Sequence, residues 1–377
     1  MSPANKPALE VPVIDVSVLL KNADEASPED LKICADELKA AVSSIGVFRI
    51  SGHGISNEDQ TDASDAVKSL FNVSEAEKHR LSVKANNIKS AAVARGYIGI
   101  GEESGSHRVE VKEGFSMGYR WDAVEAGFTP KPMGTKTRPV PETLNALQAV
   151  NVWPTEDHLD LQSRISMDSL FEHMTRVSQA LVRGFSMAMG EEAGYLTPYC
   201  KGGENISLLR LFHYFPYSQY KSDQSVDVER IGSSPHTDWG FLTLIMEPGI
   251  GGLEVFHDGE WNTVPPVPGT LVCNVGDYFS MLTNGKFVSP LHKVVTGDEE
   301  RYSIVYFYYP GYNSHIPQQT CSQDQEVPSS IRDGLKSYSL VTDQSANGAD
   351  LDQSESITLD DVPFGTYIAR KWEQVAR

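Results

Sequence analysis

The chain has 377 residues, of which 40% are hydrophobic, so it can bury the core of one large domain or of two ordinary ones. Its 32 lysines and arginines against 51 aspartates and glutamates give a net charge of −19, which repels nucleic acids and anionic membrane surfaces. The N-terminus lacks a secretory pattern, and no apolar run approaches the roughly 20 residues that span a bilayer, so we expect a cytoplasmic protein, present as a monomer, without nucleic-acid or membrane partners.

The first part of the chain mixes short strands with helices. Residues 11–20 (VPVIDVSVLL) predict a short strand, and residues 30–46 carry apolar side chains at helical spacing. Residues 47–55 (VFRISGHGI) return to a strand and a turn, and residues 56–80 contain another helical stretch. The glycine-rich residues 95–108 predict a flexible loop. We therefore expect this part to supply helices that pack against a sheet formed later in the chain.

A long helix is followed by many short strands. Between Leu161 and Met189, apolar side chains recur in steps of four and three and form one stripe: Leu170, Met174, Val177, Leu181 and Phe185. Beyond Asn205 the chain changes to short apolar runs broken by Gly, Pro and Asn: SLLRLFHYF, GFLTLIM, GLEVFH, WNTVPPV, TLVCNV, FVSPLHKVV and RYSIVYFYYP. This pattern predicts a mainly β protein with helices, in which a jelly roll or barrel-like double sheet is flanked by the helices of the first half.

These elements divide the chain into four consecutive segments. They are an N-terminal α/β elaboration (11–135), a long helical segment (136–203), a β core (204–313) and a C-terminal extension (314–377). Within the extension, the polar and acidic residues 341–361 predict a mobile loop, and residues 366–377 predict a short helix.

A histidine and an aspartate lie two positions apart in SPHTDWGFLTL, at His236 and Asp238. In a strand such residues share one face, about 6.6 Å apart along the backbone. Burying the carboxylate there is costly unless a cation neutralises it. Taken alone, the pair is more typical of a protein surface than of a metal site. His292, in the strand-like PLHKVV, adds a second imidazole, and Arg301 and Ser303 follow with the same spacing of two.

Two imidazoles and one carboxylate can occupy one face of an octahedral ion, as in non-haem Fe(II) oxygenases, and leave three positions open. Zinc would prefer a fourth ligand. With one aspartate, Fe(II) keeps a positive local charge, and Arg301 adds another, so a small dianion fits the field. A 2-oxoacid can chelate the iron while its far carboxylate contacts Arg301 and Ser303.

On these residues the chain resembles the Fe(II)/2-oxoglutarate-dependent dioxygenases of the isopenicillin N synthase-like group. VPVIDVS, GVFRISGHGI and EVKEGFSMG extend the resemblance, which runs from about residue 11 to residue 313. It implies a double-stranded β-helix (jelly roll) core flanked by helices. It also implies Fe(II) bound by the catalytic residues His236, Asp238 and His292, with 2-oxoglutarate as cosubstrate, O2 as oxidant and ascorbate as a candidate reductant.

The resemblance implies roles for further residues. Arg301 and Ser303 are expected to bind 2-oxoglutarate. Tyr214 corresponds to a tyrosine that hydrogen-bonds 2-oxoglutarate, although Phe212 stands where that segment of the family has Asn, and a core tyrosine is the alternative. Phe307 lies in phase with Arg301 and is expected either to line the substrate pocket or to be a plain core aromatic.

The implied reaction is oxidation of an unactivated C–H bond of a small-molecule substrate of specialised metabolism, by hydroxylation, desaturation or oxidative cyclisation. Three alternatives remain open: a 2-oxoglutarate-independent oxidase of the isopenicillin N synthase type, a zinc hydrolase, and a noncatalytic jelly-roll binding module. If the substrate is an amino acid derivative, we expect a second cationic side chain in the pocket, with Arg95, Arg108 and Arg210 as candidates.

Overall fold

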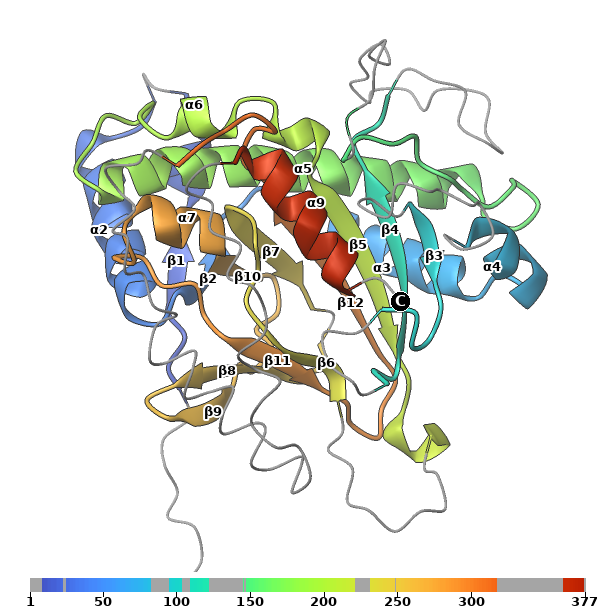
Figure 1. Cartoon of the computed structure of the whole chain (residues 1–377). Helices are drawn as coiled ribbons and strands as arrows, with labels where there is room; N and C mark the ends of the chain where they lie inside the picture. Colours follow the sequence, from blue (N-terminus) through green and yellow to red (C-terminus); the bar gives the residue numbers. More distant parts are fainter. Residues whose placement is uncertain are drawn as a thin grey trace, which may run out of the picture.

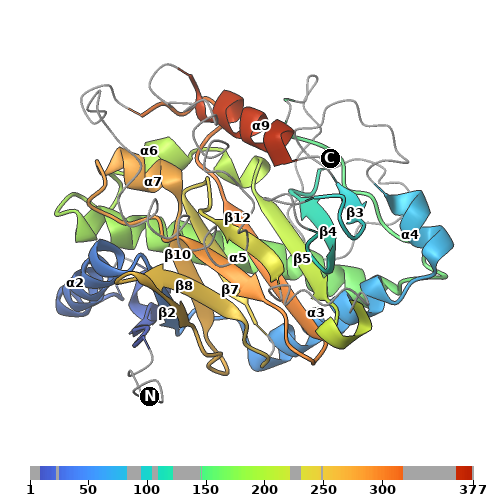
Figure 2. The same ribbon diagram turned by 60° about the horizontal axis from the view of Figure 1, so that its bottom comes forward.

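The computed structural model of the chain describes residues 9–22, 25–82, 95–103, 109–121, 145, 147–220, 231–247, 249–316 and 362–375. Two sheets and a layer of helices make up this part of the chain (Figures 1 and 2). The larger sheet contains eight strands, in the order β1 (Val13–Asp15), β2 (Val47–Ser51), β10 (Leu271–Val275), β7 (Leu242–Met246), β12 (Arg301–Tyr308), β5 (Leu208–Tyr214), β4 (Lys112–Gly118) and β3 (Gly96–Ile98). The smaller sheet contains β6 (Ile231–His236), β11 (His292–Val295), β8 (Leu253–His257) and β9 (Glu260–Thr263), in that order. All the pairings are antiparallel except that of β1 with β2.

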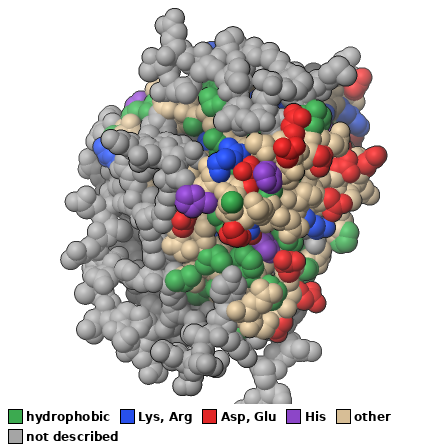
Figure 3. All heavy atoms as spheres, turned by 90° about the vertical axis from the view of Figure 1, so that its right-hand side faces the viewer, with side chains coloured by type: hydrophobic (Ala, Val, Ile, Leu, Met, Phe, Trp, Pro, Cys, Tyr) green, Lys and Arg blue, Asp and Glu red, His purple; other side chains and the backbone are tan. Residues whose placement is uncertain are grey.

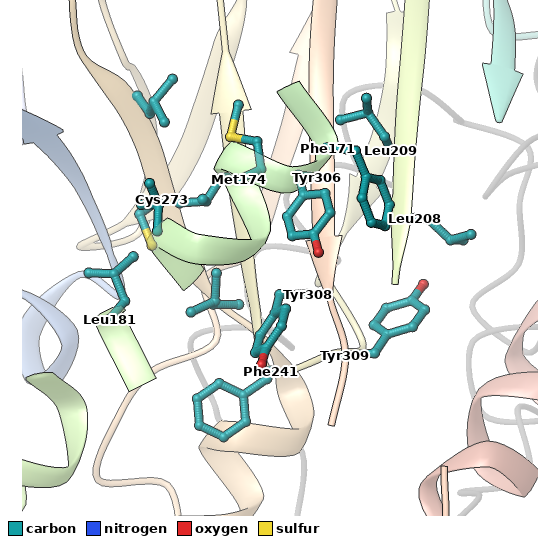
Figure 4. Packing of buried hydrophobic residues seen from close by; sticks show 14 of the residues in the cluster. Phe171, Met174, Leu181, Leu208, Leu209, Phe241, Cys273, Tyr306, Tyr308 and Tyr309 are labelled. Atoms are coloured by element: carbon teal, nitrogen blue, oxygen red, sulfur yellow. The ribbon is translucent and has the colours of Figure 1, made fainter. Parts of the chain in front are cut away.

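Helices lie on both sides of the larger sheet (Figures 1 and 2). They are α1 (Ser17–Leu20), α2 (Pro28–Ser44), α3 (Asn57–Phe71), α4 (Glu75–Leu81), α5 (Leu161–Ala188), α6 (Thr197–Cys200), α7 (Asp277–Leu282) and α9 (Phe364–Val375), with short 3-10 helices at Gly203–Asn205 and Tyr217–Tyr220. The helix α5 contacts α2, α3, β7 and β12, and runs behind the sheet in Figure 1. Its predicted apolar stripe is fully buried. In Figure 4, Phe171 and Met174 of α5 lie over Tyr306 of β12, so this stripe forms the main core.

The two faces of β5 and β12 differ sharply in chemistry. On the face toward α5, these strands carry apolar and aromatic side chains such as Leu209, Ile304 and Tyr306. On the opposite face, in register across the two strands, stand Tyr214 with Arg301, Phe212 with Ser303, and Arg210 with Val305. Since successive side chains in a strand alternate between faces, the same two strands build the core and a polar wall.

The structure confirms the β-rich second half and the helical flank predicted from the sequence, and it corrects some elements. Residues 17–20 form α1 rather than a strand, because the side chain of Asp15 accepts the backbone N–H of Ser17 and turns the chain. Within the predicted loop at 95–108, Gly96–Ile98 forms β3. Gly96 adopts φ +108° and lies against the carbonyl of Leu81, where a Cβ atom would collide. The strand β4 and the helix α7 were not predicted, and the predicted acidic loop at 341–361 lies outside the described residues.

The described surface is consistent with the strongly negative net charge. On the face shown in Figure 3, acidic side chains are spread over the described surface, and lysines and arginines appear at few places. Among the helices of the described residues, none is long and apolar enough to cross a membrane. The cysteines Cys34, Cys200 and Cys273 are buried and form no disulfide among the described residues.

A buried ionic network ties α4, β3, β4 and β5 together on the side of the larger sheet that faces α5. Glu113 of β4, 2% exposed, accepts from Lys78 (2.9 Å), from the hydroxyl of Tyr97 (2.6 Å) and from Nδ1 of His213 (2.7 Å). The other ring nitrogen of His213 lies 2.7 Å from a carboxylate oxygen of Glu300. One carboxylate therefore links three neighbouring elements.

We predict that Glu113→Ala lowers the free energy of unfolding by about 3–5 kcal/mol, because it leaves buried donors without their acceptor. Chemical denaturation measures the change. The matched control is Glu75→Ala, which removes an 88% exposed partner of Lys78 at 3.5 Å and should cost at most about 1 kcal/mol. Equal effects of the two variants would contradict the network's role.

The same network predicts a pH dependence. Burial raises the pKa of Glu113, but hydrogen bonds from His213, Tyr97 and Lys78 lower it by more, so it lies below its ordinary value of 4.5. The stability from this carboxylate is therefore complete above pH 4.5 and is lost as the pH falls through the lower folded-state pKa. Denaturation at several acidic pH values should show the difference between wild type and Glu113→Ala shrinking over that range.

Candidate active site

The residues His236, Asp238 and His292 converge between the two sheets. His236 ends β6 and His292 begins β11, and these two residues are direct partners in the antiparallel ladder, with ring centres 4.3 Å apart. Asp238 follows two residues after His236, and its Oδ1 lies 3.7 Å from Nε2 of each imidazole. All three donor atoms lie within 4.8 Å of one another. Residues up to 56 positions apart in the chain thus present two nitrogens and one oxygen to a common point.

Hydrogen bonds hold each of these side chains in a metal-binding orientation. Nδ1 of His236 lies 2.7 Å from the carbonyl of Ser234, and Nδ1 of His292 lies 3.1 Å from the carbonyl of Pro290. A proton on each Nδ1 leaves the Nε2 lone pair free to bind a cation. Asn274 of β10 donates to Oδ2 of Asp238 at 2.7 Å, which leaves Oδ1 facing the imidazoles.

The protonation states suit a cation as well. Burial, and then the neighbouring His292, lower the pKa of His236 to about 4, so its imidazole is neutral near pH 7. For Asp238, burial raises the pKa, but His292, His236, Thr243 and Asn274 together lower it below the ordinary value of 3.8. Two imidazoles and one carboxylate fit a divalent transition metal that retains open positions. In the described part of the chain, this is the one group of three or more such donors with metal-binding geometry.

The three donors line a pocket of about 140 Å³ that also contains the other residues predicted from the sequence. Arg301, Ser303, Tyr214 and Phe307 all line it. The guanidinium carbon of Arg301 lies 4.6 Å from the ring centre of Tyr214, in cation–π contact. Nη2 of Arg301 donates to Glu247 at 2.7 Å, whereas Nε and Nη1 are buried with no hydrogen-bond partner among the described residues. Those two nitrogens are therefore available to an anion in the pocket.

Two ion pairs and several aromatic rings form another part of the lining. Arg210 is bound bidentately by Glu103, at 3.0 and 2.5 Å, and its guanidinium lies 5.1 Å from the ring centres of both Phe212 and Trp372. Trp372 belongs to α9 and meets Trp239, the residue after Asp238, edge to face at 5.2 Å. The aromatic lining therefore connects α9 to the segment that carries a candidate metal ligand.

The second ion pair joins Lys112 and Glu110. Nζ of Lys112 lies 2.5 Å from Glu110, which also accepts the backbone N–H of Ser234 at 2.8 Å. Burial opposes both charges, yet the pKa of Lys112 is raised by Glu110 and the pKa of Glu110 is lowered by Lys112. Both groups therefore stay ionised inside the pocket wall.

The candidates for a second pocket cation have different outcomes. Arg210 lines the pocket, but Glu103 already neutralises it. Arg95 is not among the lining residues; it is buried, its Nη2 donates to the carbonyl of Leu147, and burial lowers its pKa to about 9. Arg108 lies outside the described residues.

Sequence reasoning missed several lining residues: Glu103, Glu110, Lys112, Trp239, Glu247, Tyr309 and Trp372. A signal was present for Glu247. It follows the run FLTLIM in phase with Thr243 and Ile245, which placed a carboxylate on the same strand face as the polar wall. The others come from segments whose pairing cannot be read from spacing along the chain.

Comparisons with known proteins agree with this geometry. The family model of the 2OG-Fe(II) oxygenase superfamily matches residues 205–310, and that of the non-haem dioxygenase in morphine synthesis N-terminal matches residues 11–156. Gibberellin 20 oxidase 2 of Oryza sativa is 27% identical over 331 residues, which cover 86% of this chain and 74% of that protein. Isopenicillin N synthase of Amycolatopsis lactamdurans is 27% identical over 312 residues, covering 82% and 88%.

A solved structure shows the same fold. The full-length Neurospora crassa protein in complex with alpha-KG and thymine has a TM-score of 0.69 and 20% sequence identity, and the match covers 98% of both chains. The predicted jelly-roll core with flanking helices is thereby confirmed.

The convergence of three donors predicts that Asp238→Asn and His292→Ala each weaken Fe(II) binding. The loss should be at least the roughly 10–100-fold that follows when only a hydrogen-bonding partner of a ligand is removed. Anaerobic Fe(II) titration followed by metal analysis measures it. The control is His257→Ala on β8, a histidine near the exposed Asp258 that does not line the pocket. Wild-type affinity in both site variants would rule out this metal site.

Proposed function

The chain belongs to the 2OG-Fe(II) oxygenase superfamily, and we propose that it oxidises an unactivated C–H bond of a small molecule of specialised metabolism. It is a 2-oxoglutarate-dependent dioxygenase and needs Fe(II), 2-oxoglutarate and O2. The proposed outcome is hydroxylation, desaturation or ring closure. The observation that carries the proposal is one pocket that joins the His236, Asp238 and His292 donors to the unpaired nitrogens of Arg301.

We assign the iron to His236, Asp238 and His292, through the two Nε2 atoms and Oδ1. When bound, Fe(II) and 2-oxoglutarate supply the oxidising power, and 2-oxoglutarate is converted to succinate and CO2 as O2 is consumed. The protein's task is to orient the reactants and to limit the access of water. The carbonyls of Ser234 and Pro290 hold the imidazoles, and Asn274 holds the carboxylate.

We assign the far carboxylate of 2-oxoglutarate to Arg301 and Ser303, with the Tyr214 ring packed against the guanidinium. Support comes from the two buried nitrogens of Arg301, because an unpaired buried guanidinium nitrogen is costly until an anion binds it. This favours a 2-oxoglutarate-dependent reaction over an oxidase that uses the same metal ligands alone. A catalytic zinc would also take three protein ligands and a water, so the three donors alone do not separate a zinc hydrolase from an iron enzyme. The matches to the 2OG-Fe(II) oxygenase and non-haem dioxygenase family models favour iron.

We assign the substrate to the part of the pocket lined by Arg210, Glu103, Trp239, Tyr309 and Trp372, with Phe307 also on the wall. Flat aromatic surfaces beside a paired guanidinium and carboxylate can hold a molecule that has both apolar faces and hydrogen-bonding groups. The pairing of Arg210 with Glu103 lessens the reason to expect an amino acid carboxylate at that arginine.

The test of the proposal is a screen of small metabolites for substrate-coupled formation of succinate by the Fe(II)-loaded protein. Stoichiometric consumption of O2 and an oxidised product identified by mass spectrometry would support it. Turnover of a substrate without release of succinate would show that the chain is not a 2-oxoglutarate-dependent oxygenase.

We predict that Arg301→Gln raises the KM for 2-oxoglutarate by roughly tenfold to a hundredfold, the value of a lost charge-assisted hydrogen bond. At saturating 2-oxoglutarate, kcat should change much less, because the metal ligands are untouched. Initial rates of succinate formation give both constants. The control Arg176→Gln alters an exposed arginine of α5 and should leave both near wild type. A large fall in kcat with an unchanged KM would contradict the assignment.

We predict that Trp372→Ala raises the KM for the compound identified by the screen. The change removes one of the two aromatic rings that contact the Arg210 guanidinium, and it opens the wall formed by α9. The affinity for 2-oxoglutarate should remain within about twofold of wild type, since the ring contacts of Trp372 are with Arg210 and Trp239. Trp372→Phe keeps an aromatic face and should restore much of the affinity. Equal weakening of both ligands would point to general damage to the fold.

A further inference from the structure

Glu247 places a buried negative charge directly beside the arginine assigned to the cosubstrate. It lines the pocket and is 2% exposed at its side chain. Its Oε1 accepts from Nη2 of Arg301 at 2.7 Å. Its Oε2 has no hydrogen-bond partner among the described residues and lies 3.9 Å from Nη2 of Arg49. The carboxylate therefore stands between two buried guanidinium groups.

Arg49 is held by other groups and does not compete for the pocket. It lies on β2, is buried, and donates to the side chain of Thr270 at 3.3 Å and to the carbonyl of Pro265. Its distance from Glu247 makes the contact an ion pair without a hydrogen bond. Glu247 is therefore hydrogen-bonded through Oε1 alone, and its partner is Arg301, the residue assigned to the ligand.

Arg49, Glu247 and Arg301 together carry a net charge of +1. Arg49 and Arg301 contribute two positive charges and Glu247 contributes one negative charge, so the group is left with +1 before a ligand binds. One carboxylate brings it to zero. Without the charge of Glu247 the group would carry +2, and an incoming carboxylate would be attracted more strongly, because interactions at these separations are weakly screened inside a protein.

We propose that Glu247 is a counter-ion that limits how tightly Arg301 binds the distal carboxylate of 2-oxoglutarate. Glu247 thereby limits the preference of the pocket for a dicarboxylate over a monocarboxylate oxoacid. This inference rests on the proposed function, which places 2-oxoglutarate at Arg301. Glu247 also keeps Nη2 of Arg301 engaged, so that Nε and Nη1 are the nitrogens left to the ligand.

Glu247→Gln separates the charge from the hydrogen bond. The amide oxygen of Gln can still accept from Nη2 of Arg301, so the arginine keeps its orientation while the negative charge is lost. The probes are 2-oxoglutarate and 2-oxopentanoate, which share the chelating keto acid end and differ in the distal carboxylate. Calorimetric titration of each into the Mn(II)-loaded protein gives their Kd values without turnover, and thermal unfolding verifies that each variant is folded.

We expect Glu247→Gln to bind 2-oxoglutarate about tenfold more tightly than wild type and to bind 2-oxopentanoate within about twofold of wild type. Glu247→Asp, which keeps the charge, should stay near the wild-type ratio of the two Kd values. Glu247→Met removes the same charge with an apolar side chain of similar length and tests the effect independently. The matched control is Glu254→Gln on β8, which neutralises a carboxylate paired with Lys293 at 3.4 Å outside the pocket.

The possible failures are distinguishable. If wild type prefers 2-oxoglutarate but Glu247→Gln leaves the ratio unchanged or lowers it, Glu247 is not the limiting counter-ion, and the proposed function stands. If wild type binds the two oxoacids equally, the distal carboxylate does not meet Arg301, and both the assignment of Arg301 and this inference fail. If the ratio of the two Kd values shifts as much in Glu254→Gln as in Glu247→Gln, the effect comes from the overall charge of the protein, and the inference is overturned.

Discussion

The antiparallel pairing of β6 with β11 brings His236 opposite His292, and the remaining parts of the site depend on this register. A slip of one residue would turn one imidazole to the other face of the sheet, because side chains alternate with a period of two. Asp238, beyond the end of β6, is then close enough to share the same point, with Asn274 of the larger sheet holding its second oxygen. The two sheets are thus joined at the site by polar contacts as well as by packing.

The pocket is a place where charge is buried in compensated pairs. Lys112 with Glu110, Arg210 with Glu103, and Arg301 with Glu247 each bring a cation and an anion to the same wall. Such pairs contribute little net stability, since the cost of desolvation offsets their attraction, but breaking one is expensive. The apolar packing of α5 on the opposite face of β5 and β12 carries the stability, which allows the inner face of these strands to be polar.

Spacing along the chain was sufficient to single out the side chains that converge as candidate ligands, and the series of short strands was sufficient to predict the jelly-roll class. Arg301 and Ser303 lie two residues apart in β12 and share one face, and the stripe of α5 shows through its helical period. His236 and Asp238 are also two residues apart, but Asp238 lies beyond the end of β6. Contacts between distant segments carry no such signal. Trp372 meets Arg210 across 162 positions of the chain, and Glu103 reaches Arg210 from a segment that the sequence predicts as loop. Short elements were also missed, because α1 and β3 depend on a single side-chain contact or a single glycine.

The placement of Trp372 on α9 has a consequence for synthesis. Every residue assigned to the iron and to 2-oxoglutarate precedes α9 in the chain, so the oxidising half of the pocket can assemble on the ribosome before the wall that would hold the substrate has been translated. Docking of α9 through Phe364, Tyr367 and Ile368, all buried against the finished core, then completes the compartment.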